Sequence, residues 1–145
     1  MAAVSVLPPI EQEYVESGRA KLVARPIAIL GDESAWAARA SLCANDQGHF
    51  WEYYDILFAN QGAERSGAFS TGRLKAFAAA LNLDSDAFGA CLDSGKHASQ
   101  VQEDTATARQ SGIQGTPTFL VNGEKVQNSA DAIKAAIDAA LAAGP

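Results

Sequence analysis

The chain has 145 residues, of which 48% are hydrophobic and 19% are charged, and its net charge is −6. This suits one globular domain over residues 1–145 with a buried core. The 11 Lys and Arg residues are scattered, which argues against nucleic acid or an anionic membrane as a partner, because both need clustered basic residues. No apolar run approaches the roughly 20 residues of a membrane span, and Met1 is not followed by the pattern of a secretory signal.

Near the N-terminus, Pro8 and Pro9 predict the start of a short helix of about two turns that ends at Gly18. Residues Lys21 to Ala24 then predict a β-strand. Pro26 interrupts this strand, because proline has no N–H to donate to a ladder.

Five helical patterns follow without a strand between them. The first four place these residues on shared apolar faces: Trp36, Ala40 and Cys43; Phe50, Tyr54 and Leu57; Leu74, Phe77, Ala78 and Leu81; Phe88, Cys91 and Leu92. Ser70 is predicted as the N-cap of the third. The fifth helix is more polar, runs from about His97 to Gln110 and ends near Gly112.

The C-terminal part begins with the turn Gly115-Thr116-Pro117. Asn122-Gly123 predicts a two-residue hairpin that pairs Phe119–Val121 with Lys125–Val126, because both turn positions of a type I′ hairpin need positive φ. A terminal amphipathic helix is predicted between the N-cap Ser129 and Gly144.

Three stretches together resemble the DsbA-like family of thiol–disulfide oxidoreductases: Ser41 to Phe58, Gly115-Thr116-Pro117-Thr118-Phe119, and Val121-Asn122-Gly123. The similarity extends from Leu7 to the end of the chain. It implies an α/β, thioredoxin-like fold with an inserted helical subdomain. Residues 1–30 and 112–145 would form the remnant of the thioredoxin core, and residues 31–111 the helical insertion.

The chain departs from the family in one respect, because the Cys-x-x-Cys pair expected just before the first helix is not in the sequence. The first β-strand and the active-site motif are therefore expected to be missing, and we predict a redox-inactive chain with no catalytic residues. Whether the chain is an enzyme stays open. One hypothesis is an oxidoreductase scaffold read from a start codon downstream of its motif, and the alternative is a non-catalytic module that binds extended or unfolded polypeptide.

The resemblance implies substrate binding by Thr116 and Pro117, with a cis bond between them. There the proline removes an N–H and leaves the preceding backbone free to pair with an extended substrate. His49 and His97 have no second ligand at helical spacing, so we predict no metal site, and no cofactor is expected.

Cys43 and Cys91 lie 48 positions apart on apolar helix faces, and neither fits a redox motif. They are either two buried thiols or a structural disulfide, as some relatives have. Both alternatives stay open at this point.

The resemblance implies polypeptide substrates or a redox-partner protein. We also expect a homodimer that covers the apolar surface around Leu22, Phe119 and Val121, because the sheet lacks its first strand. The family suggests an extracytoplasmic location, whereas a chain made from Met1 without a signal peptide would stay in the cytoplasm.

Overall fold

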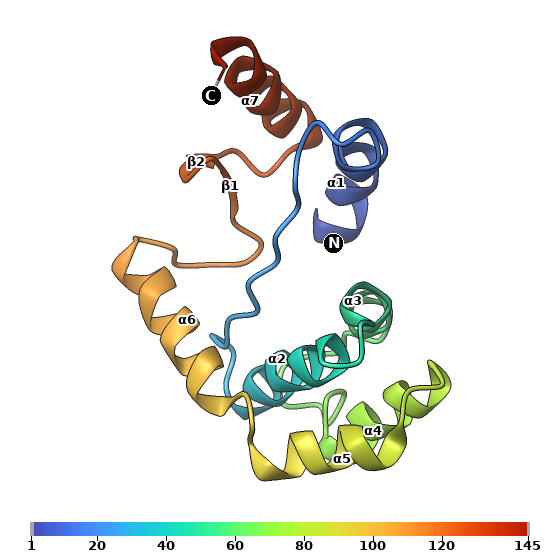
Figure 1. Cartoon of the computed structure of the whole chain (residues 1–145). Helices are drawn as coiled ribbons and strands as arrows, with labels where there is room; N and C mark the ends of the chain where they lie inside the picture. The colour runs from blue at the N-terminus through green and yellow to red at the C-terminus, as the bar shows by residue number, and fades with distance from the viewer. Residues whose placement is uncertain (1, 145) are drawn as a thin grey trace. The chain divides into compact units, whose positions relative to one another are not determined.

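The computed structural model describes residues 2–144, and their side chains from residue 5 onward (Figure 1). The residues divide into two compact units, one formed by Met1–Ala24 with Ile113–Pro145 and the other by Arg25–Gly112. The assignment of one domain to residues 1–145 stays a prediction. None of the helices in the described range has the length and apolar character needed to span a membrane.

The first unit contains helix α1, a π-helical turn, a two-stranded sheet and helix α7. Their bounds are Ala2–Ile10 for α1, Glu11–Val15 for the π-helical turn, Phe119–Val121 for β1, Glu124–Val126 for β2 and Ala130–Ala143 for α7. The two strands are antiparallel, with Val121 opposite Glu124. Asn122 and Gly123 have φ of 49° and 89°, which confirms the predicted hairpin.

The core of this unit lies between α1 and α7. Its buried side chains are Val6, Ile10, Tyr14, Ile133 and Ile137, and Ala20, Phe119, Val121 and Val126 pack against them. Ser129 caps α7 as predicted, since its side chain accepts a hydrogen bond from the Ala132 amide at 3.2 Å. The apolar periodicity of α7 thus faces the hairpin and α1.

The start of the first helix was predicted incorrectly. Helix α1 begins at Ala2 and passes through Pro8 and Pro9, which were expected to open it. A proline inside a helix costs about 3 kcal/mol. The buried side chains of Val6 and Ile10 in the same helix offset this cost, at roughly 1.5–3 kcal/mol for each. Tertiary burial therefore overrides the local preference.

The strand predicted for Lys21 to Ala24 is also wrong. Within residues 2–144 the sheet has two strands only, β1 and β2, and residues 21–24 have no ladder partner. Val23 is 60% exposed. Its β-branched side chain favours extended backbone, but a strand requires a second strand beside it, and no described residue supplies one.

The second unit consists of five helices around their own core. They are α2 (Asp32–Asn45), α3 (Phe50–Ala59), α4 (Thr71–Ala80), α5 (Ser85–Ser94) and α6 (Ala98–Gln110). All five predicted helical patterns are confirmed. Buried residues of α2, α3, α4 and α5 form one cluster, in which Tyr53 donates a hydrogen bond to the Leu74 carbonyl at 2.8 Å.

Polar side chains fix the connections between these helices. The Glu33 carboxylate accepts hydrogen bonds from the backbone amides of Gly67, at 2.9 Å, and Phe69, at 3.1 Å. These two bonds anchor the loop before α4. The Asp84 side chain caps α5 by accepting a hydrogen bond from the Ala87 amide at 2.9 Å. Ser70 occupies the predicted N-cap of α4, although its side chain makes no capping hydrogen bond.

Candidate functional site

The second unit contains a disulfide bond between Cys43 and Cys91. Cys43 lies in the last turn of α2 and Cys91 lies in α5, and their Cα atoms are 5.9 Å apart. This distance falls within the usual range for a disulfide, roughly 4.4–6.8 Å. The structure thus has the bonded form of the two alternatives that the sequence left open.

The two cysteines differ in their exposure to solvent. Cys43 is 1% exposed and belongs to the apolar cluster of the unit, whereas Cys91 is partly exposed at the edge of that cluster. Thiol–disulfide exchange requires a thiolate to reach one sulfur of the bond. Of the two cysteines, Cys91 is the one with exposed surface.

Three charged or polar side chains gather beside Cys91. Oδ2 of Asp46 lies 3.7 Å from its sulfur, 2.7 Å from Nζ of Lys96 and 2.9 Å from Nε2 of His97. Burial by itself raises the pKa of Asp46, but the hydrogen bonds from Lys96 and His97 outweigh it and hold that pKa below its ordinary value. Asp46 is therefore a stable carboxylate next to the disulfide.

The same place holds three potential metal donors, which the sequence analysis did not find. One ligand atom from each of Cys43, Cys91 and His97 lies within 4.8 Å of the other two. Cys43 lies in α2, Cys91 in α5 and His97 in the turn just before α6, so their spacing along the chain carries no metal-binding signal. The other histidine, His49, lies at the start of α3, where its Nδ1 is 3.5 Å from Oε1 of Glu52.

The predicted substrate-binding residues, Thr116 and Pro117, lie in the loop that leads into β1. The peptide bond between them is cis. Thr116 is exposed and Pro117 is half-buried. The Thr118 hydroxyl donates to the Gly115 carbonyl at 2.8 Å and closes the loop. These residues belong to the first unit, and the disulfide belongs to the second.

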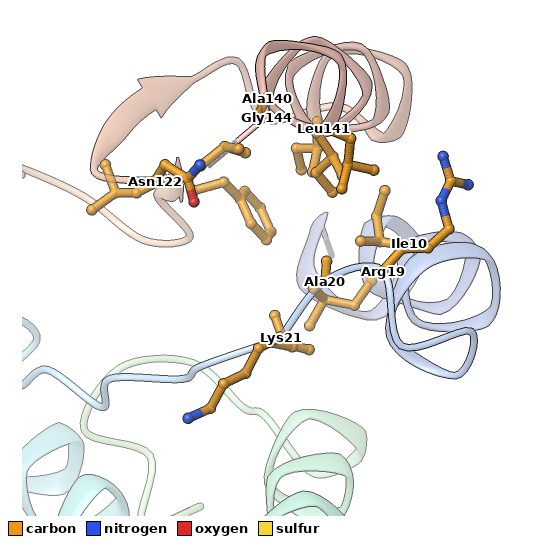
Figure 2. Close-up of a pocket in the computed structure, with 15 residues that line it drawn as sticks. Ile10, Arg19, Ala20, Lys21, Asn122, Ala140, Leu141 and Gly144 are labelled. Atoms are coloured by element: carbon orange, nitrogen blue, oxygen red, sulfur yellow. The ribbon is translucent and has the colours of Figure 1, made fainter.

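Next to β1, the first unit has an open groove of about 480 Å³ (Figure 2). Its walls come from α1, the segment 19–22, β1 and α7. The apolar side chains that line it include Leu7, Ile10, Leu22, Phe119, Ile137 and Leu141. Arg19 and Lys21 add positive charge at its rim, and Arg19 is also paired with Asp138 at 3.4 Å.

One edge of β1 at this groove has no partner strand among residues 2–144. In a two-residue hairpin the pair next to the turn exchanges backbone hydrogen bonds, here Val121 and Glu124, so the following pair, Leu120 and Lys125, does not. The N–H and C=O of Leu120 therefore point away from β2, and within residues 2–144 no other strand receives them. An extended peptide fits such an edge.

Comparisons with known proteins show the family to which the chain belongs. Residues 2–139 match the family Thioredoxin_4, described as thioredoxin. The crystal structure of oxidised BdbD from Bacillus subtilis is similar with a TM-score of 0.84 and 26% identity, over 94% of this chain and 77% of that one.

Two curated relatives are longer than this chain. It is 28% identical to the probable disulfide bond formation protein D of Bacillus cereus over 142 residues, which are 95% of this chain and 66% of that protein. It is 40% identical to the Na(+)/H(+) antiporter NhaA 1 of Salinispora arenicola over 108 residues, which are 73% of this chain and 16% of the antiporter.

These findings correct the prediction of a redox-inactive chain. That prediction is wrong, because the structure contains a disulfide between Cys43 and Cys91 and the chain resembles disulfide bond formation proteins. That prediction rested on the missing Cys-x-x-Cys spacing, which does not test for a disulfide between two cysteines that are 48 positions apart. The match over nearly the whole chain establishes that this protein belongs to the thioredoxin family.

Proposed function

We propose that this protein forms disulfide bonds in polypeptide substrates by thiol–disulfide exchange. The observation that carries the proposal is the Cys43–Cys91 disulfide with one partly exposed cysteine, in a chain similar to disulfide bond formation proteins. The chain covers 66% of that relative's length. The similarity to this relative therefore supports the proposal, and the activity itself has to be measured on this chain.

The exchange takes two steps. A substrate thiolate attacks Sγ of Cys91, which forms a mixed disulfide and releases Cys43 as a thiolate that takes up a proton. The second substrate thiolate then attacks the substrate sulfur of the mixed disulfide and releases Cys91. The substrate loses two electrons and gains a disulfide, and the Cys43–Cys91 bond gains the same two electrons and becomes a dithiol.

The surroundings of the disulfide favour attack at Cys91 over Cys43. Cys43 is 1% exposed, so a substrate cannot reach its sulfur without opening the helical core. Lys96, which is exposed beside Cys91, supplies a positive charge for an incoming thiolate and partly offsets the repulsion by Asp46.

We propose that the substrate binds as an extended chain along the loop at Thr116 and Pro117 and the free edge of β1. Pro117 has no N–H, so at that position the loop can offer the substrate a backbone carbonyl acceptor but no backbone donor. The apolar groove beside β1 offers pockets for alternate side chains of an extended peptide.

A single-turnover experiment tests the redox step. Oxidised protein is mixed with a reduced peptide that contains two cysteines, and mass spectrometry follows the peptide disulfide and the protein thiols. We expect one peptide disulfide for each Cys43–Cys91 bond that is lost. Protein whose cysteines were reduced and alkylated is the control. A peptide that stays reduced while the protein disulfide persists would show that the bond serves only to tie α2 to α5.

Peptide binding is tested separately by fluorescence anisotropy with a cysteine-free extended peptide. Pro117→Ala adds a backbone donor and makes the loop less rigid, so the loop no longer holds its backbone in place for the substrate. We expect the peptide to bind roughly tenfold more weakly, which is the effect of losing about one hydrogen bond. Pro26→Ala, in the other unit, is the matched control. Equal binding by the Pro117 variant and the wild type would remove this loop from the substrate site.

Two further expectations stay predictions. A homodimer that covers Leu22, Phe119 and Val121 would occupy the same groove as the substrate, and light scattering at micromolar concentration tests it. The hypothesis of an upstream Cys-x-x-Cys pair is tested by the coding sequence that precedes Met1.

A further inference from the structure

We propose that reduction of the Cys43–Cys91 disulfide converts this cluster into a zinc-binding site, with Cys43, Cys91 and His97 as the ligands. The proposal depends on the positions of the three donors, and it is independent of any substrate of the protein. It makes the disulfide a switch between a covalent and a metal-bridged connection of α2 and α5.

The distances fit a single metal ion. The three ligand atoms lie within 4.8 Å of one another. Around tetrahedral zinc, with bonds of about 2.0–2.3 Å, neighbouring donors lie roughly 3.3–3.8 Å apart. Once the bond is reduced, rotation of the cysteine side chains can move the two sulfurs toward these distances.

The donor set selects the metal. Two thiolates and an imidazole are soft or intermediate ligands, which favour zinc over magnesium or calcium. Three protein ligands leave a fourth position for water. Cys43 is buried, and Cys91 and His97 are partly exposed, so the site is shielded on one side and open to solvent on the other.

Asp46 gives His97 the outer-shell support that zinc-bound histidines usually have. Its carboxylate lies 2.9 Å from Nε2 of His97. Such a contact restricts the orientation of the ring, and the proposal therefore assigns Nδ1 to the metal. The His97 side chain is 14% exposed, so its ring is already held in place. Lys96 also pairs with this carboxylate, with Nζ 2.7 Å from Oδ2.

The redox chemistry balances with a phosphine as reductant. The phosphine, one water molecule and the disulfide give a phosphine oxide and two thiols. Zinc then displaces the two thiol protons and binds both thiolates together with a ring nitrogen of His97. In a cell, a dithiol would play the part of the phosphine and leave as a disulfide.

The test uses the full chain under anaerobic conditions, reduced with a phosphine and titrated with Co²⁺ and then Zn²⁺. We expect one Co²⁺ per chain with sulfur-to-cobalt charge-transfer absorption, and its displacement by Zn²⁺. The oxidised protein should show neither signal. A competing chelator gives the zinc affinity of each variant.

Variants separate a designed site from adventitious binding. His97→Ala should weaken zinc binding by at least about 100-fold, and Asp46→Asn by roughly 10- to 100-fold, as is typical for outer-shell partners. His49→Ala, which removes the other histidine, should bind like the wild type. All three variants are first checked for the wild-type circular dichroism spectrum in their oxidised form.

Two results would overturn the proposal. One is a reduced wild-type protein that binds no more metal than the oxidised protein, and the other is a His97→Ala variant with unchanged affinity. If the reduced wild type loses helical circular dichroism, zinc must restore it in the wild type and not in His97→Ala. Failure of the peptide oxidation assay would leave these metal measurements unaffected.

Discussion

The sulfur of Cys91 lies 3.7 Å from Oδ2 of Asp46, and this carboxylate faces any thiolate that approaches the disulfide. Two like charges about 4 Å apart repel each other by roughly 1 kcal/mol even in water. The balance between Asp46 and its cationic neighbour Lys96 should therefore set how fast the disulfide is reduced.

Asp46→Asn should speed the reduction of the Cys43–Cys91 bond by a small-molecule thiol about fivefold, because it removes roughly 1 kcal/mol of repulsion. Asp93→Asn is the matched control, since Asp93 lies on α5, the helix that contains Cys91, and its carboxylate pairs with Nζ of Lys75 at 2.7 Å. Thiol release is measured by a colorimetric reagent at fixed pH. An equal or slower rate for the Asp46 variant would contradict the electrostatic argument.

The disulfide should also contribute strongly to stability. A bond that joins positions 48 residues apart should stabilise the fold by about 4 kcal/mol in the loop-entropy account. The comparison is between oxidised wild type and the Cys43→Ser, Cys91→Ser double variant, measured by urea unfolding followed by circular dichroism. A difference under about 1 kcal/mol would mean that the unfolded chain loses little entropy through this bond.

The raised pKa of Tyr14 leads us to expect a lower free energy of unfolding at alkaline pH. Burial, followed by a hydrogen bond with Asp138, raises the pKa of Tyr14 to about 12. In the unfolded chain tyrosine ionises near pH 10, so between about pH 10 and 12 the unfolded state loses its proton first and the free energy of unfolding falls. Tyr14→Phe should show a shallower fall over this window. Parallel curves for the two proteins would exclude Tyr14 as the cause.

Tyr53 tests the core of the helical unit. Its side chain is fully buried, and its hydroxyl donates to the Leu74 carbonyl at 2.8 Å. Tyr53→Phe keeps the ring and removes this bond, so we expect a loss of about 1 kcal/mol in the free energy of unfolding. Thermal unfolding and urea unfolding both measure it. An equally stable variant would show that the helical bonds of α4 already satisfy that carbonyl.

Local sequence signals were sufficient for much of the fold. The Asn122-Gly123 hairpin needs positive φ at both positions, and few residues other than Asn and Gly meet that requirement. The helices of residues 31–111 follow from apolar residues repeated at helical spacing. In both cases the information lies within a few residues of the element that it predicts.

The sequence failed where a distant partner decides the outcome. Lys21 to Ala24 has the composition of a strand, but a strand exists only beside another strand, and within the described residues none pairs with it. Helix α1 crosses Pro8 and Pro9 because Val6 and Ile10 are buried against other elements. Neither result can be read from neighbours along the chain.

The candidate site shows the same division. The sequence by itself determined the Thr116-Pro117 turn before the hairpin and the absence of a local Cys-x-x-Cys spacing. Only the tertiary structure brought Cys43, Cys91, Asp46 and His97 together, from positions up to 54 residues apart. The physical reason is that sulfur, carboxylate and imidazole interact over a few ångströms, and the packing of α2, α5 and α6 sets those distances.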